Sequence, residues 1–231
     1  MPTAAPAAAL ASASRTARLL RDPRMSLLLA RTGLLQAMHP DISDALVAAP
    51  GFFDDPWECV APLADLRTGT GIDAAVRPRL TADAGAWVHA TLLNSLLVGA
   101  DLLGHPLNAF EQEDVHTESL TWPAVTAKIR KTLPASLHEY REQWHVTLTC
   151  LLEPTEAVLV LLRPGAEIPA PSPIPVVGGV LAKLGVPGVR GLPLWVGRGL
   201  LPPEARETLG LDWSAREERA LQALFAALRL T

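Results

Sequence analysis

Residues 81–104 read TADAGAWVHATLLNSLLVGADLLG and contain the longest apolar run of the chain. The run is interrupted by His89, Asn94 and Asp101. An interrupted run of this length is typical of a buried helix rather than of a membrane span. The sequence therefore predicts a helix that begins behind a Thr81 cap, ends at Gly104 and lies at the centre of the fold.

The faces of this helix follow from its pitch, because successive residues of an α-helix are about 100° apart. Apolar side chains surround the direction of His89: Leu93, Leu96, Ala100 and Leu103 all fall within about 40° of it. The polar positions gather roughly 120–140° away: Asp83, Asn94 and Asp101. His89 is therefore expected at the middle of the apolar face, whereas Trp87 points away from it and is expected to serve packing.

A histidine on such a face has two interpretations. Burying an unpaired imidazole costs roughly 1–3 kcal/mol, so the ring needs a partner. The partner can be a carbonyl or a neighbouring side chain, as in an ordinary core histidine. It can also be a metal or haem iron, since neutral imidazole in an apolar cavity commonly holds haem. The helical geometry leaves both interpretations open.

The remaining chain carries helix signals and almost no strand pattern. Expected helices cover 25–38, 41–49, 55–66 and 81–104. Three more begin at capping boxes, namely Asn108 with Glu111, Ser136 with Glu139, and Ser214 with Glu217. Residues 164–175 (PGAEIPAPSPIP) are too rich in proline for a helix and predict an extended crossing. We expect an all-α, single-domain helical bundle over 15–231 with a buried central helix, globin-like in broad character, behind a disordered leader at 1–14.

Composition excludes several classes of function. The formal net charge of −4 provides no basic field for nucleic acid. Cys59 and Cys150 lack the spacing of a metal motif and predict small core residues in a reducing compartment. No transmembrane segment or signal peptide is expected, so the default location is cytoplasmic. The oligomeric state stays open.

A di-iron carboxylate site is a rival possibility, because the chain contains two Glu-x-x-His pairs, Glu113/His116 and Glu142/His145. On the helix that begins at Leu137, however, Glu142 lies roughly 150° from the apolar stripe and should face water. A site of this kind cannot form with one ligand turned outward, so the sequence disfavours it.

Five segments in fixed order resemble one family. They are LLQAMHP, DPWECVAPLADLRT, WVHATL, LPASLHEYREQW and GLLPPEARETLGLDWSAREERAL. Together they make the chain similar to the latex-clearing-protein/MpaB oxygenases, from about Leu27 to Leu228. The resemblance implies an all-α domain that holds haem b and uses dioxygen on hydrophobic, often isoprenoid, substrates.

The resemblance also implies roles for particular residues. His89 in WVHATL matches the axial haem ligand, so it is both the metal ligand and a cofactor-binding residue, with Leu93 and Leu96 in the pocket wall. Arg67 and Thr68 resemble the family's basic-residue-plus-threonine element on the distal side and are the expected catalytic pair. His39 before Pro40 resembles a histidine-proline element before the pocket, which makes it a further cofactor-binding candidate.

Each of these roles has a structural alternative. Arg67 can be a cation that stabilises the negative end of a helix dipole at a C-terminus. Thr68 can be an ordinary turn residue, and His39 can be a structural residue of the turn between two helices. Arg31, Arg77 or Arg79 could bind the haem carboxylates, although a position on the solvated surface is the simpler interpretation for these three side chains.

The chain departs from the family between Arg67 and Trp87. An additional helix found there in typical members is missing, and Ala64 stands where an arginine is often found. We therefore expect a shortened member. The leading hypothesis is a haem b-dependent oxygenase that acts on a hydrophobic small molecule. By analogy alone, its role would be to tailor a natural product in a bacterium. The alternative is a haem-free relative that acts as a binding protein or a non-redox enzyme.

Overall fold

The computed structural model describes residues 15–64, 79–122, 127–163, 168 and 191–230. Within them every regular element is a helix, as expected from the sequence. The elements are α2 (Arg15–Leu20), the 3₁₀ helix η1 (Pro23–Leu28), α3 (Leu29–Ala37), α4 (Pro40–Val47), α5 (Pro56–Ala64), α6 (Ala82–Leu102), α7 (Ala109–Ser119), α8 (Ala127–Arg130), α9 (Leu137–Cys150), α10 (Glu156–Leu161), α12 (Leu192–Leu200), α13 (Pro203–Thr208) and α14 (Ala215–Leu228). The expected leader at 1–14 and most of the expected proline-rich crossing lie outside the described residues.

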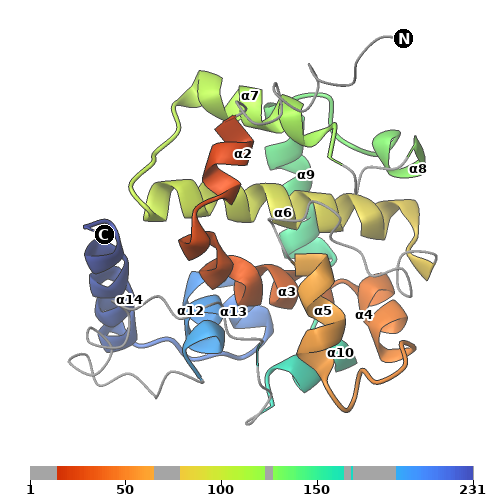
Figure 1. The fold of residues 1–231 in the computed structure, drawn as a ribbon. Coiled ribbons are helices and arrows are strands. Elements are labelled where there is room, and N and C mark those ends of the chain that lie inside the picture. Colours follow the sequence, from red (N-terminus) through yellow and green to blue (C-terminus); the bar gives the residue numbers. More distant parts are fainter. Residues whose placement is uncertain (1–14, 65–78, 123–126, 164–167, 169–190, 231) are drawn as a thin grey trace, which may run out of the picture.

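Helix α6 runs through the middle of the molecule, with α7 along one side and α3 along the other (Figure 1). Its N-terminus is capped as predicted, since the Thr81 hydroxyl accepts a hydrogen bond from the Ala84 amide at 3.2 Å. The helix ends at Leu102, and Gly104 follows with a φ of +85°. That left-handed conformation is the usual reason for a glycine just beyond a helix C-terminus. The predicted central helix is thus confirmed, with its end two residues earlier.

The burial of α6 follows the predicted faces. Leu93, Leu96 and Ala100 are fully buried, and His89 beside them is only 2% exposed. Asp101 on the polar side is exposed. Burial nevertheless extends well beyond the apolar face, because Trp87 and Ser95 are also buried. Neighbouring helices therefore surround most of α6, which is why its sequence looks apolar almost all round.

The segment expected as one helix from Met25 to Met38 divides into two elements. Pro23–Leu28 is a 3₁₀ helix, and the α-helix α3 begins at Leu29. Asp22 caps the 3₁₀ turn by accepting a hydrogen bond from the Arg24 amide at 2.9 Å. Tight turns of this kind are common at helix N-termini, and periodicity cannot distinguish them from α-helix. The predicted stop at His39-Pro40 is confirmed, because Pro40 opens α4.

Arg31 lies in the core, which corrects the expectation of a solvated surface residue. It is 2% exposed, and its guanidinium donates hydrogen bonds to three acceptors. These are the Leu200 carbonyl at 2.9 Å, the Ser95 hydroxyl at 2.7 Å and the Asn94 side-chain oxygen at 2.5 Å. Burial lowers the pKa of Arg31 to about 10, so it stays charged at neutral pH. Arg31 therefore joins α3, α6 and α12.

Helices α3 and α12 pack in close contact at a glycine. A Cβ atom at Gly197 would lie 2.6 Å from the Ala30 Cβ and 2.9 Å from the Arg31 backbone nitrogen. Real Cβ atoms do not approach backbone so closely, so one of the two helices would have to move. The glycine thus sets the separation of the two helices.

Gly197→Ala is expected to lower the free energy of unfolding by about 2 kcal/mol, because overpacking against fixed backbone costs roughly 1–3 kcal/mol. Urea denaturation followed by circular dichroism measures the change. Gly85→Ala is the matched control. The three atoms nearest to its added Cβ all belong to the Ile129 side chain, and none belongs to backbone. Equal losses in the two variants would contradict the close-packing argument.

Two of the three predicted capping boxes are complete. At Asn108 and at Ser214 the cap side chain accepts the amide of the glutamate three residues on, and that glutamate accepts the cap amide. At α9 the Ser136 hydroxyl accepts the Glu139 amide, but the Glu139 carboxylate accepts the amide of Ala135 instead. The predicted helix starts are confirmed at all three sites.

The expectation that both cysteines are small core residues is wrong for Cys150, which is exposed, while Cys59 is half-buried. Cys150 lies two positions after the buried Leu148, roughly 200° around α9, and so faces away from the core. The two cysteines are not joined in a disulfide bond.

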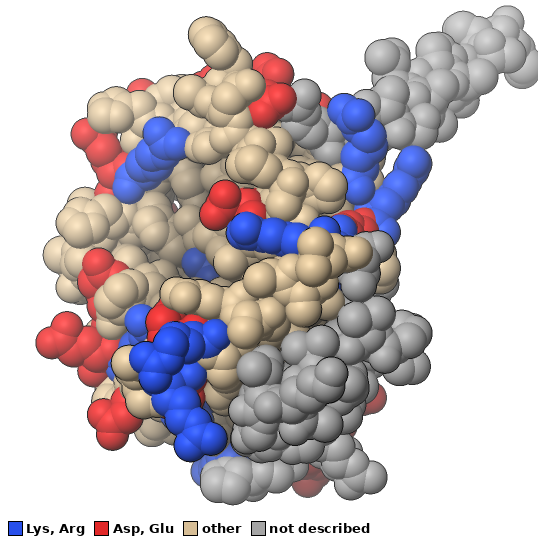
Figure 2. Space-filling model, turned by 90° about the vertical axis from the view of Figure 1, so that its left-hand side faces the viewer, with Lys and Arg blue, Asp and Glu red and all other residues tan. Residues whose placement is uncertain are grey.

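Two features of the described residues bear on the expected surroundings of the protein. No helix among them has the length and apolar character that a membrane crossing needs. On the face shown in Figure 2, basic and acidic side chains are interspersed over the described part of the surface.

Candidate functional site

His89 sits in the middle of α6, and its ring is held by α7. The Nε2 atom lies 3.0 Å from the Ser119 hydroxyl oxygen. That hydroxyl donates its single hydrogen to the His116 carbonyl at 2.6 Å. Ser119 can then only accept from the ring, so Nε2 carries the proton. The sequence left a carbonyl or a neighbouring side chain as the partner of a core histidine. The partner is the Ser119 side chain, whose hydroxyl in turn donates to a carbonyl.

The second nitrogen of His89 is unusual. In the neutral tautomer fixed by Ser119, Nδ1 holds a lone pair, and it is buried without a hydrogen-bond partner among the described residues. Burial also lowers the pKa of His89 to about 4, so the ring is neutral at physiological pH. A neutral imidazole with a free lone pair in an apolar setting is the form that binds a metal ion.

His116 is a second buried histidine beside this site. It is 1% exposed, and neither ring nitrogen has a hydrogen-bond partner within the described part of the chain. Its ring lies 6.2 Å from that of Tyr140, while Trp122 lies 5.5 Å from His89. Sequence patterns provide no reason to place His116 near His89, because the two residues come from different helices. The one sequence signal is that His116 lies three residues before Ser119, on the same face of α7.

The di-iron possibility finds no support in the described residues. Glu142 is 67% exposed, as its helical position predicted, and His145 is exposed too. No three histidine, cysteine, aspartate or glutamate side chains among the described residues gather closely enough to hold a metal ion.

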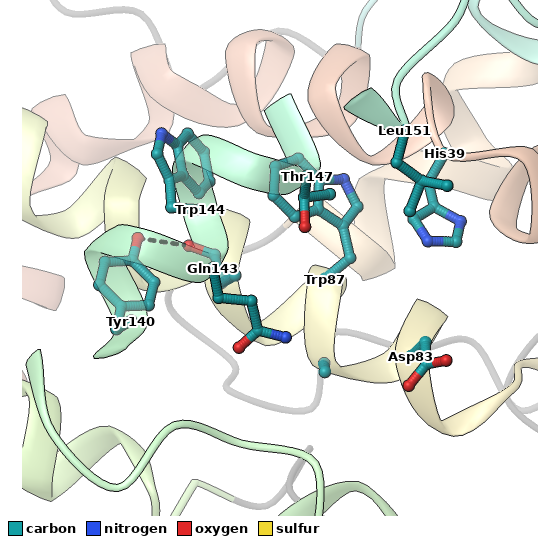
Figure 3. Close-up of a pocket in the computed structure, with 10 residues that line it drawn as sticks. His39, Asp83, Trp87, Tyr140, Gln143, Trp144, Thr147 and Leu151 are labelled. Atoms are coloured by element: carbon teal, nitrogen blue, oxygen red, sulfur yellow. Dashed lines mark hydrogen bonds between the residues drawn. The ribbon is translucent and has the colours of Figure 1, made fainter. Parts of the chain in front are cut away.

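A separate cleft of about 170 Å³ opens between α6, α9 and the corner that joins α3 to α4. Trp87 and Trp144 lie stacked in its wall, with ring centroids 4.8 Å apart and an angle of 25° between the planes. Tyr140 lines one end of the cleft, and His39 and Asp83 line the other (Figure 3). The cleft is therefore aromatic along its wall and polar at one end.

The cleft walls are fixed by buried hydrogen bonds. The Trp87 indole donates to the Leu35 carbonyl at 2.8 Å, and the Tyr140 hydroxyl donates to the Ala90 carbonyl at 3.1 Å. Burial is also the main reason that the pKa of Tyr140 is raised, so its hydroxyl stays protonated. Trp87 thus has the packing role that the sequence predicted, but it also lines a cavity, which helical periodicity could not reveal.

His39 contributes a further buried imidazole. It is 4% exposed, its Nδ1 has no hydrogen-bond partner in the described part of the structure, and burial lowers its pKa. Asp41 and Asp83 oppose that shift, which places both carboxylates near the ring.

The structure brings some of the predicted site residues together and separates others. Leu93 and Leu96 share the buried face of α6 with His89. His39 lines the aromatic cleft, and His89 is not among the residues that line it. The expected catalytic pair, Arg67 and Thr68, lies outside the described residues.

The arginines proposed for cofactor carboxylates differ in the same way. Arg31 is engaged in the core, as described above. Arg79 is exposed, as predicted, and its guanidinium donates to the Ala48 carbonyl at 2.5 Å. Arg77 lies outside the described residues.

Comparison with known proteins identifies a family. The family model described as "ER-bound oxygenase mpaB/B'/Rubber oxygenase, catalytic domain" matches residues 64–230. That range includes His89, Ser119 and His116, whereas His39 precedes it. Neither a curated protein nor a solved structure matches the chain.

Proposed function

The chain belongs to the ER-bound oxygenase mpaB/B'/rubber oxygenase catalytic-domain family, and from this premise we propose that it is an oxygenase that holds haem b through His89. Its co-substrates would be dioxygen and a hydrophobic small molecule. The observation that carries the proposal is the buried Nδ1 of His89, which has a lone pair and no partner among the described residues. Leaving such an atom unpaired costs about 1–3 kcal/mol, and coordination to iron would remove that cost.

The residues around His89 fit this role. Ser119 holds the protonated nitrogen of the ring and so fixes its tautomer, which is how outer partners orient metal-binding histidines. Leu93 and Leu96 on the same face are fully buried and keep water away from the ring. In such surroundings the imidazole stays neutral, as a haem ligand must.

The bound haem would supply the activation of dioxygen. Arg67 and Thr68 are proposed to donate hydrogen bonds to oxygen atoms on which negative charge develops during the reaction. An apolar substrate would be held by burial of its surface, at about 25 cal/mol for each Å² removed from water.

We place the oxygenase domain at 15–231, which is longer than the matched range. Helices α2 to α4 lie before the matched range and α5 ends at its first residue, yet α3 packs against α6 and α12 inside it. Leu34 of α3 and Val196 of α12 belong to the same core cluster. Removing the N-terminal helices would therefore expose the packed side of α6.

The test is the absorption spectrum and haem content of the full chain, purified after expression with added haem precursor. We expect a strong haem absorption band and stoichiometric haem by extraction, followed by dioxygen consumption with hydrophobic alkenes. A chain that stays colourless after haem is supplied both in cells and during purification would contradict the proposal. The chain would then be a haem-free relative, in which the bond from His89 to Ser119 serves only the core.

A further inference from the structure

We propose that the cleft lined by Trp87, Trp144, His39 and Asp83 binds a small aromatic amine, that is, a single ring that carries a protonated amino group on a short arm. This site is separate from His89, and the inference does not depend on haem. It rests on the size of the cleft, its aromatic wall and the distribution of charge around it.

The size of the cleft limits the ligand. A cavity of about 170 Å³ compares with the engineered cavity of about 150 Å³ that accommodates benzene. Pockets for drug-sized ligands are larger, at roughly 300–1,000 Å³. The cleft therefore has room for one ring and a short substituent but not for a long prenyl chain.

The wall of the cleft suits an aromatic cation. Trp144 is half-buried and stacks on the buried Trp87, so the pair forms a rigid aromatic surface. Tryptophan faces attract organic cations, by about 0.5–1 kcal/mol at exposed sites and more in dry ones. Leu151, 45% exposed, adds an apolar edge to the lining.

Charge at the polar end selects the sign of the ligand. Asp83 is exposed, and among the described residues that line the cleft it is the only charged one, with no lysine or arginine beside it. The side chain of His39 beside it is only 4% exposed, and its Nδ1 atom has no hydrogen-bond partner in the described structure. A buried polar atom of this kind calls for a partner, which a ligand or ordered solvent at this end of the cleft would supply. An ammonium group would find the Asp83 carboxylate here, whereas a carboxylate would be repelled by it.

The position of the cleft on α6 separates it from the His89 site. By helical geometry, Ala86, Asp83 and Ala90 lie roughly 60–120° around the axis from His89, and Trp87 lies roughly 160° from it. Tyr140 lies beside both sites, because it lines the cleft and its ring lies 6.2 Å from that of His116.

Three probes that share one scaffold test the proposal: benzylamine, benzyl alcohol and benzoate, which are cationic, neutral and anionic at neutral pH. Binding to the full chain is measured by calorimetry and by saturation-transfer NMR. We expect benzylamine to bind at least about tenfold more tightly than benzoate, with benzyl alcohol between them, because the Asp83 charge acts with opposite sign on the two ions. No binding by any probe, or equal binding by all three, would overturn the proposal.

Two variants locate the site. Asp83→Asn is expected to lower the affinity for benzylamine to that for benzyl alcohol, and to leave the affinity for benzyl alcohol unchanged. Thr147→Phe should fill the cleft and abolish binding of both. Its matched control is Thr149→Phe, on the exposed side of the same helix, which should bind as the unaltered chain does. If Thr147→Phe folds normally by circular dichroism and still binds benzylamine, the ligand sits elsewhere and the assignment is wrong.

Discussion

His89→Ala is expected to purify without haem, with at least about a 100-fold loss of haem affinity. The reason is that changing even outer partners of a ligand typically costs 10–100-fold, and here the ligand itself is removed. Absorption titration of the haem-free chain with haem measures the affinity directly. The fold is expected to persist, since the lost ring makes one hydrogen bond to the described residues, to Ser119.

Two companion variants give this result its meaning. Ser119→Ala removes only the group that fixes the His89 tautomer, so we expect it to bind haem about 10–100-fold more weakly and with an altered spectrum. His145→Ala removes an exposed histidine on α9 and should bind as the unaltered chain does. Full haem retention by a folded His89→Ala chain would show that another residue is the ligand, while the family assignment would stand.

Arg31→Ala is expected to lower the free energy of unfolding by about 3–5 kcal/mol. The change leaves the Leu200 carbonyl, the Ser95 hydroxyl and the Asn94 amide oxygen without their donor. A buried acceptor that loses its partner costs about 1–3 kcal/mol, and such costs are not fully additive. Here the bonds to Leu200 and Asn94 are part-buried, and the Thr32 hydroxyl also lies 2.8 Å from the Ser95 oxygen. A cavity at the contact of α3, α6 and α12 adds to the loss. Urea denaturation, followed by two independent probes, measures the difference.

Arg31→Met and Arg141→Ala separate the causes. Methionine restores much of the volume but none of the donors, so Arg31→Met should recover only the part of the loss that comes from the cavity. Arg141 is exposed and donates one hydrogen bond, to Gln112 at 2.6 Å, so its removal should change stability by less than about 0.5 kcal/mol. A loss below about 1 kcal/mol in Arg31→Ala would mean that relief of the buried charge offsets the broken bonds.

The start of each capped helix could be predicted because capping is a local interaction. Thr81, Asn108 and Ser214 bond to amides three residues away, whatever the rest of the chain does. The expectation for α3 was less accurate, since a 3₁₀ turn and an α-helix present similar apolar patterns over the six residues of η1. Local sequence thus predicts where helices begin better than it predicts the kind of first turn.

The sequence by itself determined the helical class, the central place of the helix from 82 to 102 and the burial of His89 on its apolar face. These depend on periodicity and short-range spacing, which are properties of the chain alone. Only the tertiary structure decided the tautomer of His89, the burial of Arg31 and the cleft that joins His39 to Trp87. Each of these depends on groups from different helices. His89 and Ser119 are 30 residues apart in the sequence, and Arg31 and Leu200 are 169 residues apart. No local pattern encodes such contacts, because they arise only when packing brings distant helices together.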